Sequence, residues 1–373
     1  MNFELVATCL FGLEKLLGEE LTRLGFDRVA TIDGRVVFRA DEDGIARANV
    51  GLRFAERVYI RLGHFKAETF DRLFEGTKAL PWEMWIGKKD AFPVKGHAIH
   101  SKLFSVPDCQ KIVKKAIVER LKKQYGIAWF EESEIKYQVE LFILKDEVSL
   151  MIDTTGAPLH KRGYRIESNE APIRETLAAA IAAISRPLPH VLLWDPMCGS
   201  GTIAIEGAMI AKNIAPGKNR SFAAMDFPAI PKGAWQRARE EALSLELSNE
   251  FEAYASDIDP KTLAIAEANV KRAGLSSVVR CFEADARKIK ALDRRGTIVT
   301  NPPYGERLGT VEEARALYRE IGSAFNALSP WHVYVISSDK EFERFYGKRA
   351  DRVRKLYNGM LPCNLYQYFG GKK

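Results

Sequence analysis

Four short apolar segments in the second half of the chain are each followed by a polar residue. The segments are residues 191–194, 251–256, 278–282 and 297–300, and the polar residues are Asp195, Asp257, Asp285 and Asn301. Helical sequence patterns follow the first two segments, and short apolar runs that alternate with helices indicate parallel strands. The carboxyl ends of parallel strands meet at one edge of a sheet, where open α/β folds bind ligands. The sequence therefore predicts an α/β domain with a site at that edge.

A glycine-rich segment, DPMCGSGT at residues 195–202, connects the first of these strands to a helical pattern. A strand, loop and helix start of this kind leaves backbone N–H groups free and lets a ligand approach the backbone closely. The polar end of a ligand can dock there. The same loop is also an ordinary tight turn of an α/β protein, so the other strand ends must supply further evidence.

The acid at the end of the second strand indicates the kind of ligand. In nucleotide-binding folds, an acid at this place binds the hydroxyl groups of a ribose. We choose Asp257 over Asp259, because Asp257 directly ends the strand, whereas Pro260 and a helix follow Asp259. Asp285, after the third strand, lies where it could meet the amine of an adenine. The pattern predicts a ligand that contains a nucleoside.

The fourth strand ends in Asn301-Pro302-Pro303-Tyr304. The side-chain oxygen of Asn301 and the carbonyl of Pro302 can accept two hydrogen bonds from a planar NH2 group. Tyr304 could stack on the ring that carries the amine, a contact worth on the order of 1–3 kcal/mol. Asn is not a useful base near neutral pH, so we expect it to position the amine and stabilise a developing cation. The alternative is a strand-ending turn, because Asn and Pro are common turn residues.

This ordered set of strand ends resembles the class I methyltransferases that use S-adenosylmethionine (SAM). The resemblance implies a Rossmann-like domain at residues 171–373 with a seven-stranded sheet, which would include strands at residues 331–337, 350–357 and 364–369. It implies Asn301, Pro302 and Tyr304 as catalytic residues. The implied SAM contacts are Asp195, Met197, Cys198, Gly199, Ser200, Gly201, Thr202, Asp257, Ile258, Asp285, Ala286 and Asn301. Residues 171–176 would form part of the floor of the SAM pocket, although Glu175 could equally be a charge at a helix N-terminus.

Composition limits the other classes. The net charge of +7 and the pI of about 9.0 fit an anionic partner. Five cysteines without CxxC or Cys/His spacing predict reduced thiols in a cytoplasmic protein, with no disulfide framework and no metal site. We expect no signal peptide, because the N-terminus has no basic region followed by a long apolar stretch. The apolar runs are too short to span a membrane.

The N-terminal part of the chain alternates between strand and helix patterns. Residues 1–64 follow a βαββαβ order, which is typical of a ferredoxin-like domain and says little about function. In the next region, residues 65–155, a strand at 92–101 precedes a helix at 107–123, and strands at 135–144 and 148–153 follow. Residues 95–123 carry eight Lys or Arg against two acids. On charge alone, a solvated helix face is as good an interpretation as a binding surface.

This second region resembles the THUMP domain, an RNA-binding module. The resemblance implies RNA contacts from Lys102, Lys111, Lys114, Lys115 and Lys122, which would orient the RNA through its phosphates. The linker at residues 156–170 contains Lys161, Arg162 and Arg165, which could carry an RNA strand toward the active site or simply form a charged linker. An insertion at residues 213–250 could be an RNA-facing flap or a solvated excursion with one amphipathic helix.

The whole chain resembles the THUMP-containing RNA guanine-N2 methyltransferases. The resemblance implies that a monomer transfers a methyl group from SAM to guanine N2 in a structured RNA, with 23S ribosomal RNA preferred over the acceptor stem of tRNA. The Asn-Pro-Pro-Tyr motif also serves DNA adenines, so an N6-adenine DNA methyltransferase is an alternative. A further alternative from another class is an RNA-binding ribosome assembly factor, which would bind RNA equally well after replacement of Asn301.

Overall fold

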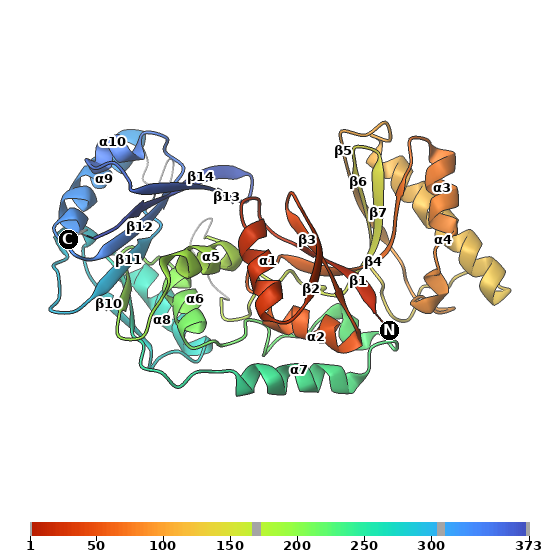
Figure 1. Ribbon diagram of the computed structural model, residues 1–373, viewed down its shortest axis with the longest axis horizontal. Helices are drawn as coiled ribbons and strands as arrows, with labels where there is room; N and C mark the ends of the chain where they lie inside the picture. Colours follow the sequence, from red (N-terminus) through yellow and green to blue (C-terminus); the bar gives the residue numbers. More distant parts are fainter. Residues whose placement is uncertain (1, 166–172, 304–309, 371–373) are drawn as a thin grey trace. The chain divides into compact units, whose positions relative to one another are not determined.

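The computed structural model describes residues 2–165, 173–303 and 310–370. The chain forms two compact units. The N-terminal unit comprises Met1–Cys9, Gly18–Leu159 and Arg220–Glu241, and the C-terminal unit comprises Leu10–Leu17, His160–Asn219 and Ala242–Lys373. Each unit contains one seven-stranded sheet (Figure 1). The predicted α/β class, with an α+β N-terminal region and a seven-stranded C-terminal sheet, is confirmed.

The sheet of the N-terminal unit has the strand order β2-β3-β1-β4-β7-β6-β5. Only β5 and β6 run parallel to each other. The strands are β1 (Phe3–Thr8), β2 (Asp27–Ile32), β3 (Arg35–Ala40), β4 (Arg57–Lys66), β5 (Val94–Ile99), β6 (Val139–Leu144) and β7 (Glu147–Asp153). The helices of this part of the chain are α1 (Glu14–Arg23), α2 (Glu42–Gly51), α3 (Phe70–Lys78), α4 (Val106–Tyr125) and α7 (Lys232–Ser244). Because β4 runs through residues 64 and 65, the ferredoxin-like and THUMP regions share one continuous sheet.

Strand alternation explains how this sheet forms its core. Leu5, Ile60, Ile152 and Val139 lie side by side on four neighbouring strands, and all four side chains are buried. In α4, the apolar residues Val113, Ile117 and Leu121 lie on one face of the helix and are fully buried. The helix ends where Gly126 adopts the left-handed conformation, with φ of 65°. Figure 1 shows α3 and α4 on the same side of β5, β6 and β7.

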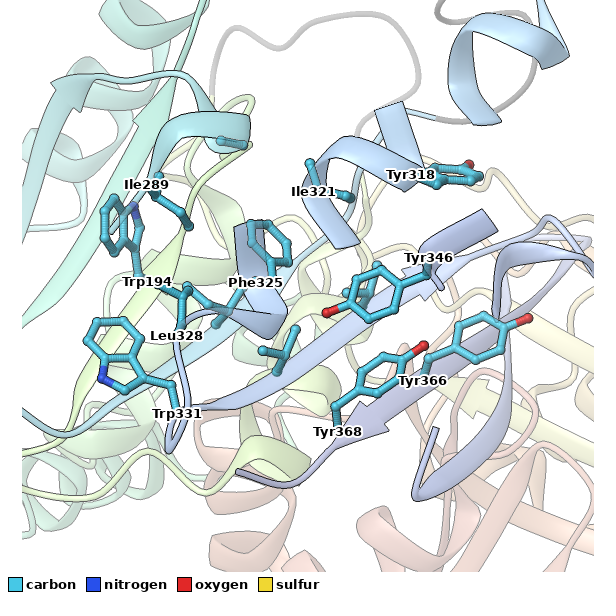
Figure 2. Packing of buried hydrophobic residues seen from close by; sticks show 14 of the residues in the cluster. Trp194, Ile289, Tyr318, Ile321, Phe325, Leu328, Trp331, Tyr346, Tyr366 and Tyr368 are labelled. Atoms are coloured by element: carbon cyan, nitrogen blue, oxygen red, sulfur yellow. The ribbon is translucent and has the colours of Figure 1, made fainter. Parts of the chain in front are cut away.

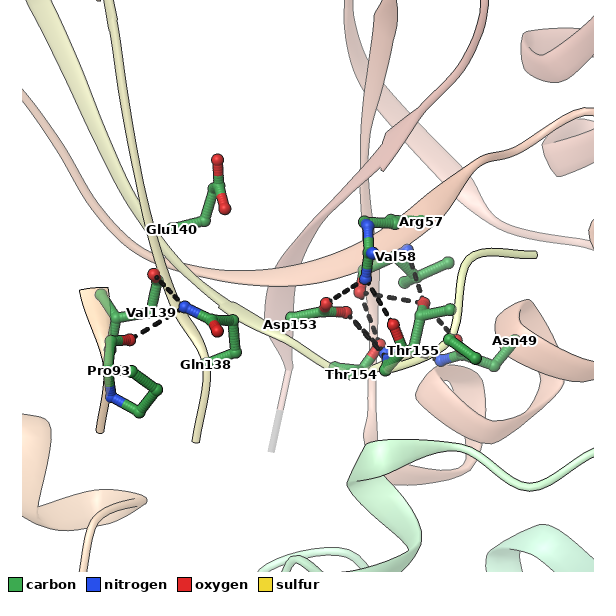
Figure 3. Close-up of polar contacts among 12 residues, drawn as sticks. Asn49, Arg57, Val58, Pro93, Gln138, Val139, Glu140, Asp153, Thr154 and Thr155 are labelled. Carbon is green, nitrogen blue, oxygen red and sulfur yellow. Dashed lines mark hydrogen bonds and ion pairs between the residues drawn. The ribbon is translucent and has the colours of Figure 1, made fainter. Parts of the chain in front are cut away.

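A buried polar network joins α2 to the ends of β4 and β7 (Figure 3). The amide of Asn49 donates to Thr154 Oγ1 at 2.9 Å, and Thr155 Oγ1 donates to Asn49 Oδ1 at 2.7 Å. Arg57 forms an ion pair with Asp153 beside it. Because α2 belongs to the ferredoxin-like region and β7 to the THUMP region, the network ties these regions together within one unit.

Residues 220–241 of the insertion at 213–250 belong to the N-terminal unit, and the rest of the insertion belongs to the C-terminal unit. Trp235 on α7 is buried and stacks on Phe222, with ring centroids 5.3 Å apart. Arg220 donates to the carbonyls of Ala157 and Leu159. Arg237 pairs with Asp43, and Arg239 donates to the Arg220 carbonyl. Arg220 and Arg239 are therefore engaged within the protein, whereas Arg237 is 58% exposed, and an RNA-facing role of this insertion stays a prediction.

The sheet of the C-terminal unit has the strand order β10-β9-β8-β11-β12-β14-β13. Six strands run in the same direction, and β14 runs antiparallel to its neighbours β12 and β13. The strands are β8 (Leu192–Asp195), β9 (Ala253–Asp257), β10 (Val279–Glu283), β11 (Gly296–Thr300), β12 (His332–Ser337), β13 (Arg352–Asn358) and β14 (Leu361–Tyr368). The helices are α5 (Glu175–Ser185), α6 (Thr202–Ala211), α8 (Pro260–Arg272), α9 (Val311–Asn326) and α10 (Phe342–Tyr346).

An aromatic core fixes α9 and α10 against this sheet. Tyr346 stacks on Tyr368 with ring centroids 4.5 Å apart, and Phe342 stacks on Tyr366 at 4.8 Å (Figure 2). Tyr318 on α9 meets the edge of Phe342. The sequence analysis assigned no helix to residues 311–326, although Thr310 and Glu313 form a capping box at its start. Tyr318, Ile321 and Phe325 of α9 share a buried core with Ile298 of β11, the strand that Asn301 follows.

No helix among the described residues is long and apolar enough to cross a membrane. In the same parts of the chain, no three His, Cys, Asp or Glu side chains are grouped as a metal site requires.

Candidate active site

A cavity of about 820 Å³ lies at the carboxyl ends of β8, β9, β10 and β11. The predicted site residues that line it are Asp195, Met197, Cys198, Gly199, Ser200, Thr202, Asp257, Ile258, Asp285, Ala286 and Asn301. Gly201 and Pro302 do not line the cavity, although both neighbour residues that do. Tyr304 lies outside the described residues. The four strand ends therefore meet at one site, as their sequence order predicts.

The glycine-rich loop is held in place by neighbouring elements. The Cys198 N–H donates to the Ser256 carbonyl at 2.9 Å, and the Asn269 side chain donates to the Ser200 carbonyl at 3.0 Å. Gly201 has a φ of 77°, and a Cβ there would lie 3.2 Å from Ala266. Only glycine meets both conditions without strain. Gly201 therefore shapes the loop by letting α8 approach it.

Asp257 carries the hydrogen bonds expected of a residue that organises a ligand site. Its Oδ2 accepts from the Gly199 N–H at 3.0 Å, and its Oδ1 accepts from the Asp259 N–H at 3.1 Å. A carboxylate has about four lone-pair positions, so two remain for ribose hydroxyls. Asp259 caps α8, accepting from the N–H groups of Lys261 and Thr262. This division of roles supports the choice of Asp257.

Asp285 is held differently from Asp257. Both of its carboxylate oxygens accept hydrogen bonds from Arg287, each at 2.8 Å, and this pairing lowers the pKa of Asp285. Arg287 also bonds Glu320 on α9 at 3.2 Å. Asp285 therefore stays ionised near neutral pH, and its contact with an adenine amine stays a prediction.

Asp195 is the most deeply buried acid of the cavity. Its Oδ1 accepts from Thr300 Oγ1 at 2.7 Å and from the Met197 N–H at 3.3 Å. Burial raises the pKa of Asp195 to about 7, because a carboxylate is poorly solvated there. The hydrogen bond from Thr300 links the end of β8 to the strand that carries Asn301.

Asn301 differs from the three acids of the cavity described above. Its side-chain oxygen is buried, and among the described residues no donor bonds to it. Asn301 lines the cavity with Pro303, whose carbonyl accepts from Tyr318 at 3.5 Å. A buried acceptor without a partner is unfavourable by about 1–3 kcal/mol, so a ligand N–H group would relieve that penalty.

Two of the predicted RNA contacts belong to the support of this cavity instead. Arg162 is buried and pairs with the buried Glu206 at 3.3 Å. Arg165 donates to Glu175 at 2.9 Å and to the Ile173 carbonyl at 2.7 Å. The prediction of RNA contact is wrong for Arg162, because RNA cannot reach its side chain. Arg165 is only 12% exposed and is already engaged.

The lysines predicted to bind RNA are mostly paired with acids. Lys102 pairs with Glu68, Lys114 with Glu132, Lys111 with Asp108 and Lys122 with Glu119. Lys114 also lies 3.5 Å from the centre of the Phe92 ring. Lys115 and Lys161 are exposed and have no acid partner among the described residues.

Sequence reasoning missed several residues that line the cavity. They are Ile203, Asp259, Thr262, Arg287, Pro303, Glu313, Ala316, Leu317 and Glu320, whereas Ile173 lies in the segment 171–176 that was expected to form part of the pocket floor. Four of them lie on α9, whose capping box Thr310-x-x-Glu313 was the available signal. Their contribution to the cavity depends on how α9 packs, which is a tertiary property.

This arrangement is suited to a nucleoside-containing methyl donor. Asp257 offers lone pairs for ribose hydroxyls, while Ile258 and Ala286 add apolar surface to the same cavity. A seven-stranded sheet of this order, with such a cavity beside Asn301, defines the class of the protein as a SAM-dependent methyltransferase.

Comparison with known proteins gives the family. Residues 162–367 match the family described as RMKL-like, methyltransferase domain. Residues 4–59 match the RlmL ferredoxin-like domain, and residues 67–153 match the THUMP domain. The chain therefore belongs to the RMKL-like methyltransferases and carries a THUMP domain.

Three relatives illustrate this similarity. YpsC of Bacillus subtilis, named as a candidate RNA methyltransferase, is 44% identical over 99% of this chain and 96% of its own length. The ribosomal RNA large subunit methyltransferase K/L of Psychromonas ingrahamii is 33% identical over 96% of this chain, which spans 49% of that longer protein. SMU.472, a candidate methyltransferase solved in complex with SAH, is 40% identical with a TM-score of 0.92, and the match covers 100% of this chain and 99% of that one.

Proposed function

We propose that this methyltransferase transfers a methyl group from SAM to the exocyclic N2 of a guanine, and that its substrate is 23S ribosomal RNA. The observation that carries the proposal is the buried side-chain oxygen of Asn301 at the SAM cavity, to which no described residue donates a hydrogen bond. It is an acceptor placed for one N–H of an amine. In this proposal the Pro302 carbonyl accepts from the second N–H, and Tyr304 stacks on the base.

The chemistry follows from these contacts. The lone pair of an exocyclic amine is delocalised into its ring, which makes the amine a poor nucleophile. Two accepted hydrogen bonds would orient the amine and favour the positive charge that develops on nitrogen as the methyl group arrives. In this proposal the methylated nitrogen then loses its proton to solvent, because Asn301 is not a base near neutral pH.

RNA is favoured over DNA by the rest of the chain. The THUMP domain is an RNA-binding module, and it occupies residues 67–153. Two relatives are named for RNA, and one of them for ribosomal RNA of the large subunit. The chain spans 49% of the K/L protein, so the substrate of that longer protein enters here only as part of the proposal. A tRNA guanine is the second candidate for the same chemistry. We retain residues 1–64, 65–155, 156–170 and 171–373 as the proposed domain division.

The test is methyl transfer from labelled SAM to separately purified, unmodified 23S rRNA, tRNA and duplex DNA, followed by nucleoside mass analysis. We expect N2-methylguanosine in 23S rRNA. The same nucleoside in tRNA would keep the reaction and change the substrate. N6-methyladenine in DNA would overturn the proposal.

A further inference from the structure

A strip of positive charge lies on the edge strand of the C-terminal sheet. Residues 347–362 contain five Lys or Arg and one acid, Asp351. Lys348, Arg349, Arg352 and Lys355 are exposed, and none of them pairs with an acid among the described residues. Asp351 accepts a hydrogen bond from the Phe369 N–H at 2.7 Å. We call these four cations the β13 strip; Lys348 and Arg349 precede β13, and Arg352 and Lys355 project from opposite faces of this edge strand.

Strand register places one end of the β13 strip at the active-site edge. Thr300 on β11 is level with Val335 on β12, and Val335 is level with Tyr366 on β14. Tyr366 in turn is level with Val353 on β13. β13 runs parallel to β11, so Lys355 lies two residues beyond that level, toward the edge where Asn301 follows Thr300. Neighbouring strands lie about 4.8 Å apart, so three strand spacings place Lys355 roughly 15 Å from Asn301.

The turn between β13 and β14 adds apolar surface at the same end. Met360 is 96% exposed and Leu361 is 43% exposed. Exposed Met and Leu side chains next to cations suit nucleic acid, which offers base faces beside its phosphates. A purely acidic polypeptide would offer no apolar surface for Met360 to contact.

Cations on an edge strand have a second common use, which is to prevent pairing with another chain. In β13 the middle of the strand is already covered. Arg354 donates to the Gly12 carbonyl at 3.1 Å, and a Cβ on Gly12 would lie 2.9 Å from the Lys355 carbonyl oxygen. Because Gly12 already lies against β13, the four cations of the β13 strip are less needed to prevent pairing with another chain.

We propose that the β13 strip and Met360 form an RNA-docking surface that binds phosphates flanking the target nucleotide. The proposal rests on the proposed function in that it takes RNA as the substrate. The RNA contact would then lie on the same sheet as Asn301, and the sheet would fix the distance between the bound phosphates and the reacting amine.

The test is RNA affinity at several salt concentrations for Arg352→Glu/Lys355→Glu, with unmodified 23S rRNA as the probe. The control is Lys271→Glu/Lys290→Glu, which changes the net charge equally at two other exposed lysines of the C-terminal unit. We expect binding weaker by about tenfold or more and a flatter salt dependence for the β13 variant only, because fewer phosphates are neutralised. SAM affinity and thermal unfolding should match the wild type. If charge reversal impairs folding, Arg352→Ala/Lys355→Ala gives the same comparison.

Equal RNA affinity of the two charge-reversal variants would overturn the proposal. Loss of polyglutamate binding with unchanged RNA binding would also overturn it and indicate an acidic protein partner. The result is separable from the proposed function. Selective loss of RNA affinity in a protein that forms no N2-methylguanosine would retain the docking surface and reject the proposed reaction. Normal formation of N2-methylguanosine together with unchanged RNA affinity of the β13 variant would retain the proposed reaction and reject the docking surface.

Discussion

Helix α4 of the N-terminal unit and strand β13 of the C-terminal unit both look like basic surfaces in the sequence, yet the fold treats them differently. Lys114 on α4 meets Glu132, and Arg120 meets Glu83, so acids from other segments neutralise the helix. No described acid pairs with Lys348, Arg349, Arg352 or Lys355 around β13. The charge of a segment is therefore a poor guide to a binding surface, and what the fold places beside each cation is a better one.

The same contrast appears inside the active site. Asp195 and Asp285 have their hydrogen-bond partners within the protein, whereas the Asn301 side-chain oxygen has none among the described residues. Groups with internal partners hold the structure, and groups without them remain available to a ligand. If this distinction is right, changing a paired group should lower stability, and changing an unpaired group should impair function.

The largest effect on stability is expected from Arg162→Ala. Removing this arginine leaves Glu206 charged and fully buried, which destabilises a protein by about 3–5 kcal/mol. The neighbouring exposed Lys161→Ala should leave stability unchanged. Denaturant unfolding of both variants checks this, and equal midpoints would contradict the assignment of Arg162 to the protein interior.

The next effect is a pH dependence at Asp195. Because burial raises the pKa of this acid to about 7, the folded state holds a proton that the unfolded state releases near pH 4. Stability contributed by the protonated form is complete below the unfolded pKa and is lost as pH rises through the folded one. At about 1.4 kcal/mol per pKa unit, the loss is on the order of a few kcal/mol.

Asp195→Asn removes the charge and keeps an acceptor for Thr300 and Met197. The variant should match the wild type near pH 4 and exceed it in stability above pH 7. Urea unfolding across that range measures the difference. Parallel stability curves for the two proteins would show that Asp195 titrates normally.

A smaller effect is expected for SAM affinity in Asp257→Ala. The Gly199 and Asp259 N–H groups lose their acceptor, and the ribose hydroxyls lose theirs. Calorimetry should show binding weaker by about 10- to 100-fold, equivalent to about 1.4–2.7 kcal/mol. Asp259→Ala is the control, since it removes a helix cap without touching this loop; a larger loss there would reverse the roles of the two acids.

The smallest effect is expected on α4. Lys114→Ala removes the pair with Glu132 and the contact with the Phe92 ring, which together stabilise the fold by about 1 kcal/mol. Lys115→Ala should not change stability, because Lys115 is exposed and has no described acid partner. It should weaken RNA binding slightly. A lower melting temperature for Lys115→Ala and an unchanged one for Lys114→Ala would contradict the distinction between paired and unpaired lysines.

The sequence predicted the parts of the site that depend on local order. Asp195 and Asp257 end their strands, and Asp285 and Asn301 lie within two residues of a strand end, so sheet topology brings all four to one edge. The contributions of α9 and of Arg287 were missed, because they depend on how a helix packs across the strand ends. The internal pairing of Lys102 and Arg162 was missed for a related reason: Glu68 and Glu206, their partners, lie 34 and 44 residues away.

The central claim is that Asn301 acts on the substrate amine and has no structural duty. Single-turnover formation of N2-methylguanosine in unmodified 23S rRNA by Asn301→Ala, with SAM affinity measured in parallel, tests it most directly. We expect a rate lower by about 100-fold or more, as for removal of a transition-state hydrogen bond, with SAM affinity and stability close to the wild type. A near-normal rate, or a loss explained by weaker SAM binding or partial unfolding, would contradict it.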